Sequence, residues 1–81
     1  MPKAKTLSGA DVVKIFATFG FELVSQRGSH MKLRRVLPDG SKQTLTIPNH
    51  RELDRGTVLG IYRQALRYLA SEELAPHFFN K

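Results

Sequence analysis

The sequence contains no cysteine and no long apolar run, and each absence excludes a class of protein. Without cysteine, the 81-residue chain cannot form a disulfide or a thiolate metal site, so packing alone must hold its core together. No apolar stretch approaches the roughly 20 residues that a membrane-spanning helix needs. Residues 1–5 also lack the apolar segment of a signal peptide, so we expect a cytoplasmic protein that does not enter a membrane.

Acidic side chains are few, and the balance of charge is strongly basic. Lys and Arg number 13 against 7 Asp and Glu, which gives a formal net charge of +6 at pH 7. A small body with this charge carries a positive field that favours polyphosphates such as nucleic acids. The charge favours such a partner without identifying it.

The sequence also lacks the motifs of metal-dependent and nucleotide-dependent enzymes. It has no glycine fingerprint for phosphates, no serine nucleophile elbow and no HExxH pair. Its histidines, His30, His50 and His77, lie far apart and have no adjacent pair of carboxylates. We therefore expect neither a metal nor a cofactor.

The length of the chain allows one domain with one core. We expect residues 1–6, which are polar and basic, to be a flexible leader and residues 7–70 to form the domain. Residues 71–81 are expected to be a C-terminal extension that begins with a short helix, limited by Pro76, and ends flexibly.

Two segments of the domain have apolar residues at helical spacing. In the first, Ser8 is a suitable N-cap for a capping box, and Gly20 is a suitable stop. The second helix runs to about Ala70 from a cap at Asp54 or at Thr57.

The period of the apolar residues changes to two between the helices, which predicts three strands joined by tight turns. The strand segments are residues 21–26, 30–37 and 42–47. In the first of them, the alternation places Phe21, Leu23 and Ser25 on one face.

The second strand alternates between polar and apolar side chains over residues 30–34. Met31 and Leu33 share one face, and His30, Lys32 and Arg34 share the other. The order α-β-β-β-α predicts an α+β fold in which a three-stranded antiparallel sheet has two helices on one face. If Met31 and Leu33 face the helices, the three charged residues stand on the open face, and a shift of one residue in register would reverse this.

His30 is the candidate catalytic residue because of its surroundings. An imidazole with an ordinary pKa near neutrality is suited to proton transfer. His30 follows Gly28, which permits close approach of a ligand, and Ser29, whose hydroxyl can hydrogen-bond phosphate oxygens. The nearby cations in the sequence are Arg27, Lys32, Arg34 and Arg35. A phosphate at this turn would lie among cations with an imidazole in reach, although a plain hairpin fits the same pattern.

Several short motifs lie in order along residues 7–66, and one of them contains His30. They are the Gly28-Ser29-His30 element, Gly56-Thr57 and Gln64-Ala65, with similar runs at residues 7–14, 20–24 and 46–53. These motifs, in this order, resemble those of the HicA toxin family. Met31 stands where that family often has a polar residue, and residues 67–81 extend beyond its usual core.

The resemblance implies a fold like that of a double-stranded-RNA-binding domain. It also implies a type II toxin that cleaves mRNA and is neutralised by a HicB-like antitoxin, with His30 as the catalytic residue. His50 matches a second histidine of the family and is a secondary candidate.

Together these observations predict a metal-independent endoribonuclease, an mRNA interferase, in which His30 acts on the ribose 2′-hydroxyl. The residues expected to contact the RNA are Arg27, Gly28, Ser29, Lys32 and Arg34. Two other functions remain open. The same basic face would also suit an RNA-binding module that does not cut, or a subunit that meets only a protein partner.

Overall fold

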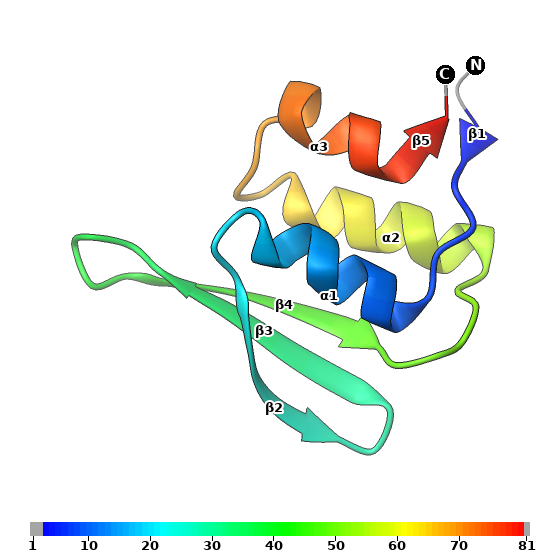
Figure 1. Cartoon of the computed structure of the whole chain (residues 1–81). Coiled ribbons are helices and arrows are strands. Elements are labelled where there is room, and N and C mark those ends of the chain that lie inside the picture. Colours follow the sequence, from blue (N-terminus) through cyan, green and yellow to red (C-terminus); the bar gives the residue numbers. More distant parts are fainter. Residues whose placement is uncertain (1–2, 81) are drawn as a thin grey trace.

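The computed structural model describes residues 3–80 and shows an antiparallel sheet covered by helices on one face (Figure 1). The sheet has the order β2-β3-β4, formed by β2 (Glu22–Arg27), β3 (His30–Val36) and β4 (Lys42–Pro48). The helices in this part of the chain are α1 (Gly9–Ala17), α2 (Arg55–Ala65) and α3 (Ser71–Phe78). Two short strands, β1 (Lys3–Ala4) and β5 (Phe79–Asn80), pair with each other. The predicted α+β class and the order α-β-β-β-α from α1 to α2 are confirmed.

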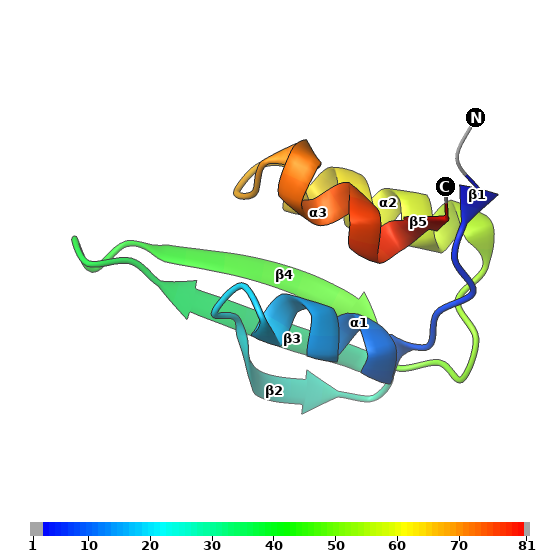
Figure 2. The same cartoon turned by 45° about the horizontal axis from the view of Figure 1, so that its top comes forward.

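The helices α1 and α2 lie on the same face of the sheet, and the opposite face carries no helix (Figure 2). The largest fully buried side chains come from both layers: Phe16, Phe78, Leu33, Leu45, Ile47, Leu74, Val12 and Val58. One core therefore fills the space between the sheet and the helices, as predicted. The arrangement is compatible with a fold like that of a double-stranded-RNA-binding domain.

Helix α1 begins and ends where its sequence predicts. The Ser8 hydroxyl accepts the N–H of Asp11 at 2.9 Å, and the Asp11 carboxylate accepts the N–H of Ser8 at 2.9 Å, so a capping box forms. Gly20 follows the helix with a φ of 90°, a conformation that glycine adopts at little cost. Between these ends, Val12 and Phe16 are four residues apart and fully buried, which gives the helix one core-facing stripe.

Strand β3 alternates as predicted. Met31 and Leu33 are buried, whereas His30 and Lys32 are exposed. On the buried face, Leu33 pairs with Leu45 of β4, so apolar partners lie side by side under the helices. The open face consequently holds His30, Lys32 and Arg34.

Strand β2 departs from the predicted alternation. Leu23 pairs with Leu33, but Ser25 pairs with Lys32, so β2 carries one extra residue between these pairs. A bulge of this kind reverses which face the following side chains occupy. The prediction that Phe21, Leu23 and Ser25 share a face is therefore wrong at Ser25, which lies beside Lys32 on the open face.

Helix α2 is shorter than predicted. Asp54 provides the cap, since its carboxylate accepts the N–H of Thr57 at 2.7 Å. The helix ends at Ala65 rather than near Ala70, and in the turn that follows, the N–H groups of Arg67 and Tyr68 donate to carbonyls three residues back. The tightened turn allows the chain to reverse into α3.

Residues 71–80 are part of the folded body: the expected short helix is present as α3, and residues 79–80 form β5. Helix α3 continues through Pro76 to Phe78, although Pro76 has no N–H to donate to the preceding turn. Leu74 and Phe78 are fully buried and four residues apart, so packing stabilises this helix. The Phe78 ring contacts the rings of Phe16 and Tyr62 at centroid distances of 5.8 and 5.7 Å.

From residue 3 onward, the segment expected to be a leader pairs with the C-terminal part of the described chain. Lys3 pairs with Asn80 and Ala4 with Phe79, which brings the two ends of the chain together (Figure 1). The N–H of Lys5 donates to the carbonyl of Phe78 at 2.9 Å. Backbone hydrogen bonds thus fix this segment, while residues 1–2 lie outside the described residues.

Candidate active site on the open sheet face

The turn between β2 and β3 presents the backbone around Gly28 to solvent. Gly28 has a φ of 58°, and a β-carbon added there would meet nothing within 4 Å. The positive φ explains the glycine, and the open space leaves the turn accessible to a ligand. The Gln26 amide donates to the carbonyl of Gly28 at 3.0 Å, which holds the turn from one side.

His30 begins β3 and has neighbours on both sides. It pairs with Arg27 across the turn and with Pro48 of β4. Directly paired residues share a face of a sheet, so Arg27 and Pro48 flank the exposed imidazole. The predicted position of His30, at the start of the strand on the open face, is confirmed.

An open hollow beside His30 gathers side chains from all three strands. Its lining residues are Ser25, Gln26, Arg27, His30, Lys32 and Thr46. This lining contains two cations and no carboxylate, so it attracts an anion to the imidazole. The groups available there are an imidazole, two hydroxyls, an amide, a guanidinium and an ammonium.

Sequence reasoning missed Gln26 as a member of this hollow, and it also missed Ser25 and Thr46. The latter two residues pair with Lys32, Ser25 from β2 and Thr46 from β4. Their proximity arises from the register of the strands and not from spacing along the chain. The alternation in β4 could have indicated Thr46, whereas the bulge hid Ser25.

Arg34 and Arg35 are adjacent in the sequence but have different surroundings. Arg34 shares the open face and lines a second hollow farther along β3. Arg35 faces the helices, where it donates to the Gln43 amide oxygen at 2.9 Å and to the Phe19 carbonyl at 3.0 Å. Its guanidinium also lies over the Phe21 ring, 4.9 Å from the centroid. Arg35 is therefore a structural residue and not one of the cations around His30.

The other two histidines lie away from the hollow lining. His50 follows Asn49, whose N–H donates to the carbonyl of Ser29, so the chain before His50 lies against the turn. The carbonyl of His50 accepts the N–H of Gly9 at 2.9 Å, which fixes its backbone. His77 lies in α3, where its ring stands edge-on to that of Phe19 with centroids 5.5 Å apart.

Gln64 of α2 secures the outer edge of β4 next to the hollow. Its amide oxygen accepts the N–H of Thr46 at 2.9 Å, and its amide nitrogen donates to the carbonyl of Thr46 at 3.3 Å. The side chain thus substitutes for a neighbouring strand at this residue. Thr46 is held in place on both sides, by β3 and by α2.

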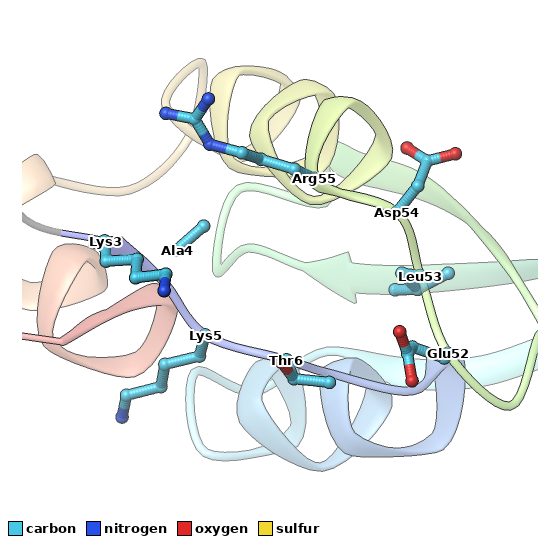
Figure 3. A pocket seen from close by; sticks show the side chains of 8 residues that line it. All are labelled: Lys3, Ala4, Lys5, Thr6, Glu52, Leu53, Asp54 and Arg55. Atoms are coloured by element: carbon cyan, nitrogen blue, oxygen red, sulfur yellow. The ribbon is translucent and has the colours of Figure 1, made fainter.

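Another hollow lies between the chain near β1 and the start of α2 (Figure 3). Its lining residues are Lys3, Ala4, Lys5, Thr6, Glu52, Leu53, Asp54 and Arg55. Several of its charged groups are already engaged, because Asp54 caps α2 and the ammonium of Lys5 donates to the carbonyl of Pro76 at 2.9 Å. The pKa of the Asp54 carboxyl is lowered, mainly by the hydrogen bond from the backbone N–H of Thr57. We therefore assign this hollow a structural role.

Within residues 3–80, no group of three or more His, Cys, Asp or Glu side chains could hold a metal ion. None of the helices in that part of the chain is long and apolar enough to cross a membrane.

The fold and the hollow together define a class: a small, basic α+β protein that presents an imidazole among cations on an open sheet face. The model of one family, described as the HicA toxin of bacterial toxin–antitoxin systems, matches residues 9–66 of the chain. The match covers α1, the three-stranded sheet and α2, and the chain belongs to this family. It is accordingly the toxin of a toxin–antitoxin system, in which an antitoxin is its partner.

A search of curated proteins and a search of solved structures each found no match.

Proposed function

We propose that this toxin is an endoribonuclease that cleaves mRNA without a metal ion and uses His30 as its proton-transfer group. The observation that carries the proposal is the hollow that His30 lines together with Arg27 and Lys32. An exposed imidazole among cations suits a phosphodiester, which brings negative charge and a reacting hydroxyl to the same place. Membership of the HicA family supports this interpretation.

The proposed reaction uses a nucleophile that the RNA itself supplies. His30 removes the proton of the ribose 2′-hydroxyl, and the oxygen attacks the adjacent phosphorus. The bond from phosphorus to the 5′-oxygen of the next nucleotide breaks, and a solvent water supplies the proton that this oxygen takes up. The products are a 2′,3′-cyclic phosphate and a 5′-hydroxyl, and no step requires a metal-bound water.

The cations of the open face would stabilise the transition state. Arg27 and Lys32 line the hollow with His30, and they are placed to offset the negative charge that develops on the phosphorane. The Ser29 hydroxyl and the backbone of Gly28 supply hydrogen bonds at the turn, and Arg34 contacts the RNA farther along β3. General acid–base catalysis by one imidazole contributes about 10²–10⁴-fold, so we expect a slow nuclease.

Inhibition by the antitoxin would follow from the same geometry. We infer that a HicB-like antitoxin covers the open face with acidic groups, since it would block His30 and neutralise the path of the phosphates together. His50 is a secondary residue in this proposal, because the chain that leads to it lies against the Ser29 backbone.

The test is incubation of the purified protein with mRNA in the presence of EDTA, followed by mapping of the product ends. The proposal predicts cleavage in EDTA, products with 2′,3′-cyclic phosphate and 5′-hydroxyl ends, and resistance of a substrate with 2′-deoxyribose at the cut site. Cleavage that EDTA abolishes would contradict the proposed chemistry. Retention of RNA without cleavage would favour the non-catalytic RNA-binding module, and the absence of both would favour a subunit that meets only a protein.

A further inference from the structure

A second hollow on the open face has a chemistry different from that of the hollow at His30. Its lining residues are Gly20, Glu22, Val24, Arg34 and Val36. Arg34 and Val36 lie on β3 beyond Lys32, toward the turn that joins β3 to β4 (Figure 1). The open face thus carries two hollows along one strand.

Two exposed valines add apolar surface to the second hollow, beside the charged side chains of Glu22 and Arg34. Val24 is 43% exposed and Val36 is 59% exposed, which places both among the most exposed large apolar side chains of residues 3–80. Val24 lies within the bulge of β2, between the pairs that Leu23 and Ser25 make with β3. The bulge therefore brings Val24 to the hollow, and exposed apolar groups clustered in a hollow mark a binding surface.

The polar groups of the second hollow do not suit a phosphate. Glu22 pairs directly with Arg34 in the sheet, and both side chains line the hollow, which therefore contains a carboxylate as well as a guanidinium. A carboxylate repels a phosphate, but it accepts hydrogen bonds from the exocyclic amino group of a nucleobase. The planar guanidinium of Arg34 and the two valines offer surfaces on which a flat, apolar base face can pack.

The two hollows are close enough to serve one RNA strand. Arg34 is four residues from His30 along β3, which corresponds to about 13 Å at the rise of a β-strand. Lys32 lies between them on the same face and can hold the intervening phosphate.

From this arrangement we propose that the second hollow binds one unpaired nucleobase of the RNA whose phosphate lies at His30, with a preference for bases that carry an amino group. The inference deepens the proposed function, on which it rests for the identity of the ligand. The base packs on Val24, Val36 and the Arg34 guanidinium, and Glu22 accepts the hydrogen bond of its amino group. The hollow would then contribute to the choice of cleavage site.

The experiment measures binding, so that it does not depend on cleavage. Short RNAs with an abasic nucleotide at each successive position are titrated by fluorescence anisotropy against His30→Ala and against His30→Ala combined with Val36→Ser. We expect one position at which loss of the base weakens binding to the His30→Ala protein by about five- to tenfold, in the range of single-base stacking. The Val36→Ser combination should abolish that difference, while Leu66→Ser, at an exposed apolar residue outside the hollow, should preserve it.

A second series replaces the base at the sensitive position. Uracil, which lacks an amino group, should bind more weakly than cytosine, and Glu22→Gln should reduce this preference while Glu72→Gln leaves it unchanged. The inference is wrong if the abasic scan gives equal losses at all positions, or if Val36→Ser weakens binding of every RNA equally. It is also wrong if Val36→Ser leaves the scan unchanged and weakens only the antitoxin complex, which would make the hollow a protein-docking site. Failure of the proposed function itself would appear separately, as intact RNA after incubation with the unmutated protein.

Discussion

The two faces of β3 separate stability from function within one strand. On the helix side, Met31 and Leu33 are 4% and 0% exposed. On the open side, His30 and Lys32 are exposed and line a hollow without carboxylates. Because side chains alternate along a strand, each residue that holds the core is followed by one that is available to a ligand.

This comparison explains why the register of β3, and not the composition of the strand alone, determines whether His30 is exposed. A slip of one residue between β3 and its neighbours would bury His30 and Lys32 and expose Met31 and Leu33. The burial of Met31 and Leu33 on the helix side therefore fixes the register that exposes His30 and Lys32 on the open side. Substitutions on the two sides should have different effects, which can be measured separately.

The largest loss of stability is expected from Phe78→Ala, which tests whether residues outside the family match belong to the helix-side core. Phe78 is fully buried against Phe16 and Tyr62, so its removal should cost about 3–5 kcal/mol of unfolding free energy. Urea unfolding followed by circular dichroism measures the change, with exposed Glu73→Ala as the control. A loss below about 1 kcal/mol, the size usual for surface sites, would show that α3 is not part of the core.

A pair of adjacent substitutions in β3 tests the comparison directly. Leu33→Ala should destabilise the protein by about 2–5 kcal/mol, because the side chain is fully buried between the sheet and the helices. Lys32→Ala should change stability by less than about 0.5 kcal/mol and should weaken RNA binding. Equal effects of the two substitutions on the unfolding midpoint would break the distinction between the faces.

The arginine pair allows the same test without a change of charge. Arg35→Lys loses the hydrogen bonds to Gln43 and Phe19, and should cost about 1.5–3 kcal/mol of stability. Arg34→Lys, on the open face, should change stability by less than about 0.5 kcal/mol. Thermal unfolding of both variants measures the difference, and a more destabilised Arg34→Lys protein would reverse the assignment of faces.

The smallest expected effect concerns acid, which acts on the helix caps. The pKa of the Asp11 carboxyl is lowered, first by the hydrogen bond from the Ser8 backbone, and that of Asp54 is lowered, first by the N–H of Thr57. A lowered pKa in the folded state means that the stabilisation is complete above the ordinary value of 3.8 and is lost as the pH falls through the folded-state pKa. Unfolding curves measured over acidic pH should show this loss, and Asp11→Asn should make the curve flatter. A slope unchanged by Asp11→Asn would contradict the role of the cap.

The sequence predicts the central part of the fold and the basic residues of the candidate site, Arg27, His30 and Lys32, because both depend on local periodicity. The alternation around Met31 and Leu33 predicts the faces of β3, and the turn at Gly28 predicts where the strand begins. Ser8 and Asp54 likewise predict where α1 and α2 begin, because a helix cap is a local feature of the sequence.

The remaining features depend on contacts between distant parts of the chain, which leave little trace in local sequence. The pairing of Lys3 with Asn80 is too short to have a period, and the bulge near Val24 is defined only by its partner strand. Helix α3 contains Pro76, which argues against a helix locally, and it is stabilised by the burial of Phe78 in a core formed by other elements.

The central claim is that His30 catalyses RNA cleavage without supporting the fold, and the most direct test is to measure stability, RNA affinity and cleavage rate on one preparation of His30→Ala. The proposed role predicts a stability change below about 1 kcal/mol. It also predicts retained RNA binding and a cleavage rate lower by about 10²–10⁴-fold. His50→Ala, which removes an imidazole that does not line the hollow, is the matched control and should lose less activity. A folded His30→Ala protein that cleaves RNA at the unmutated rate would contradict the account.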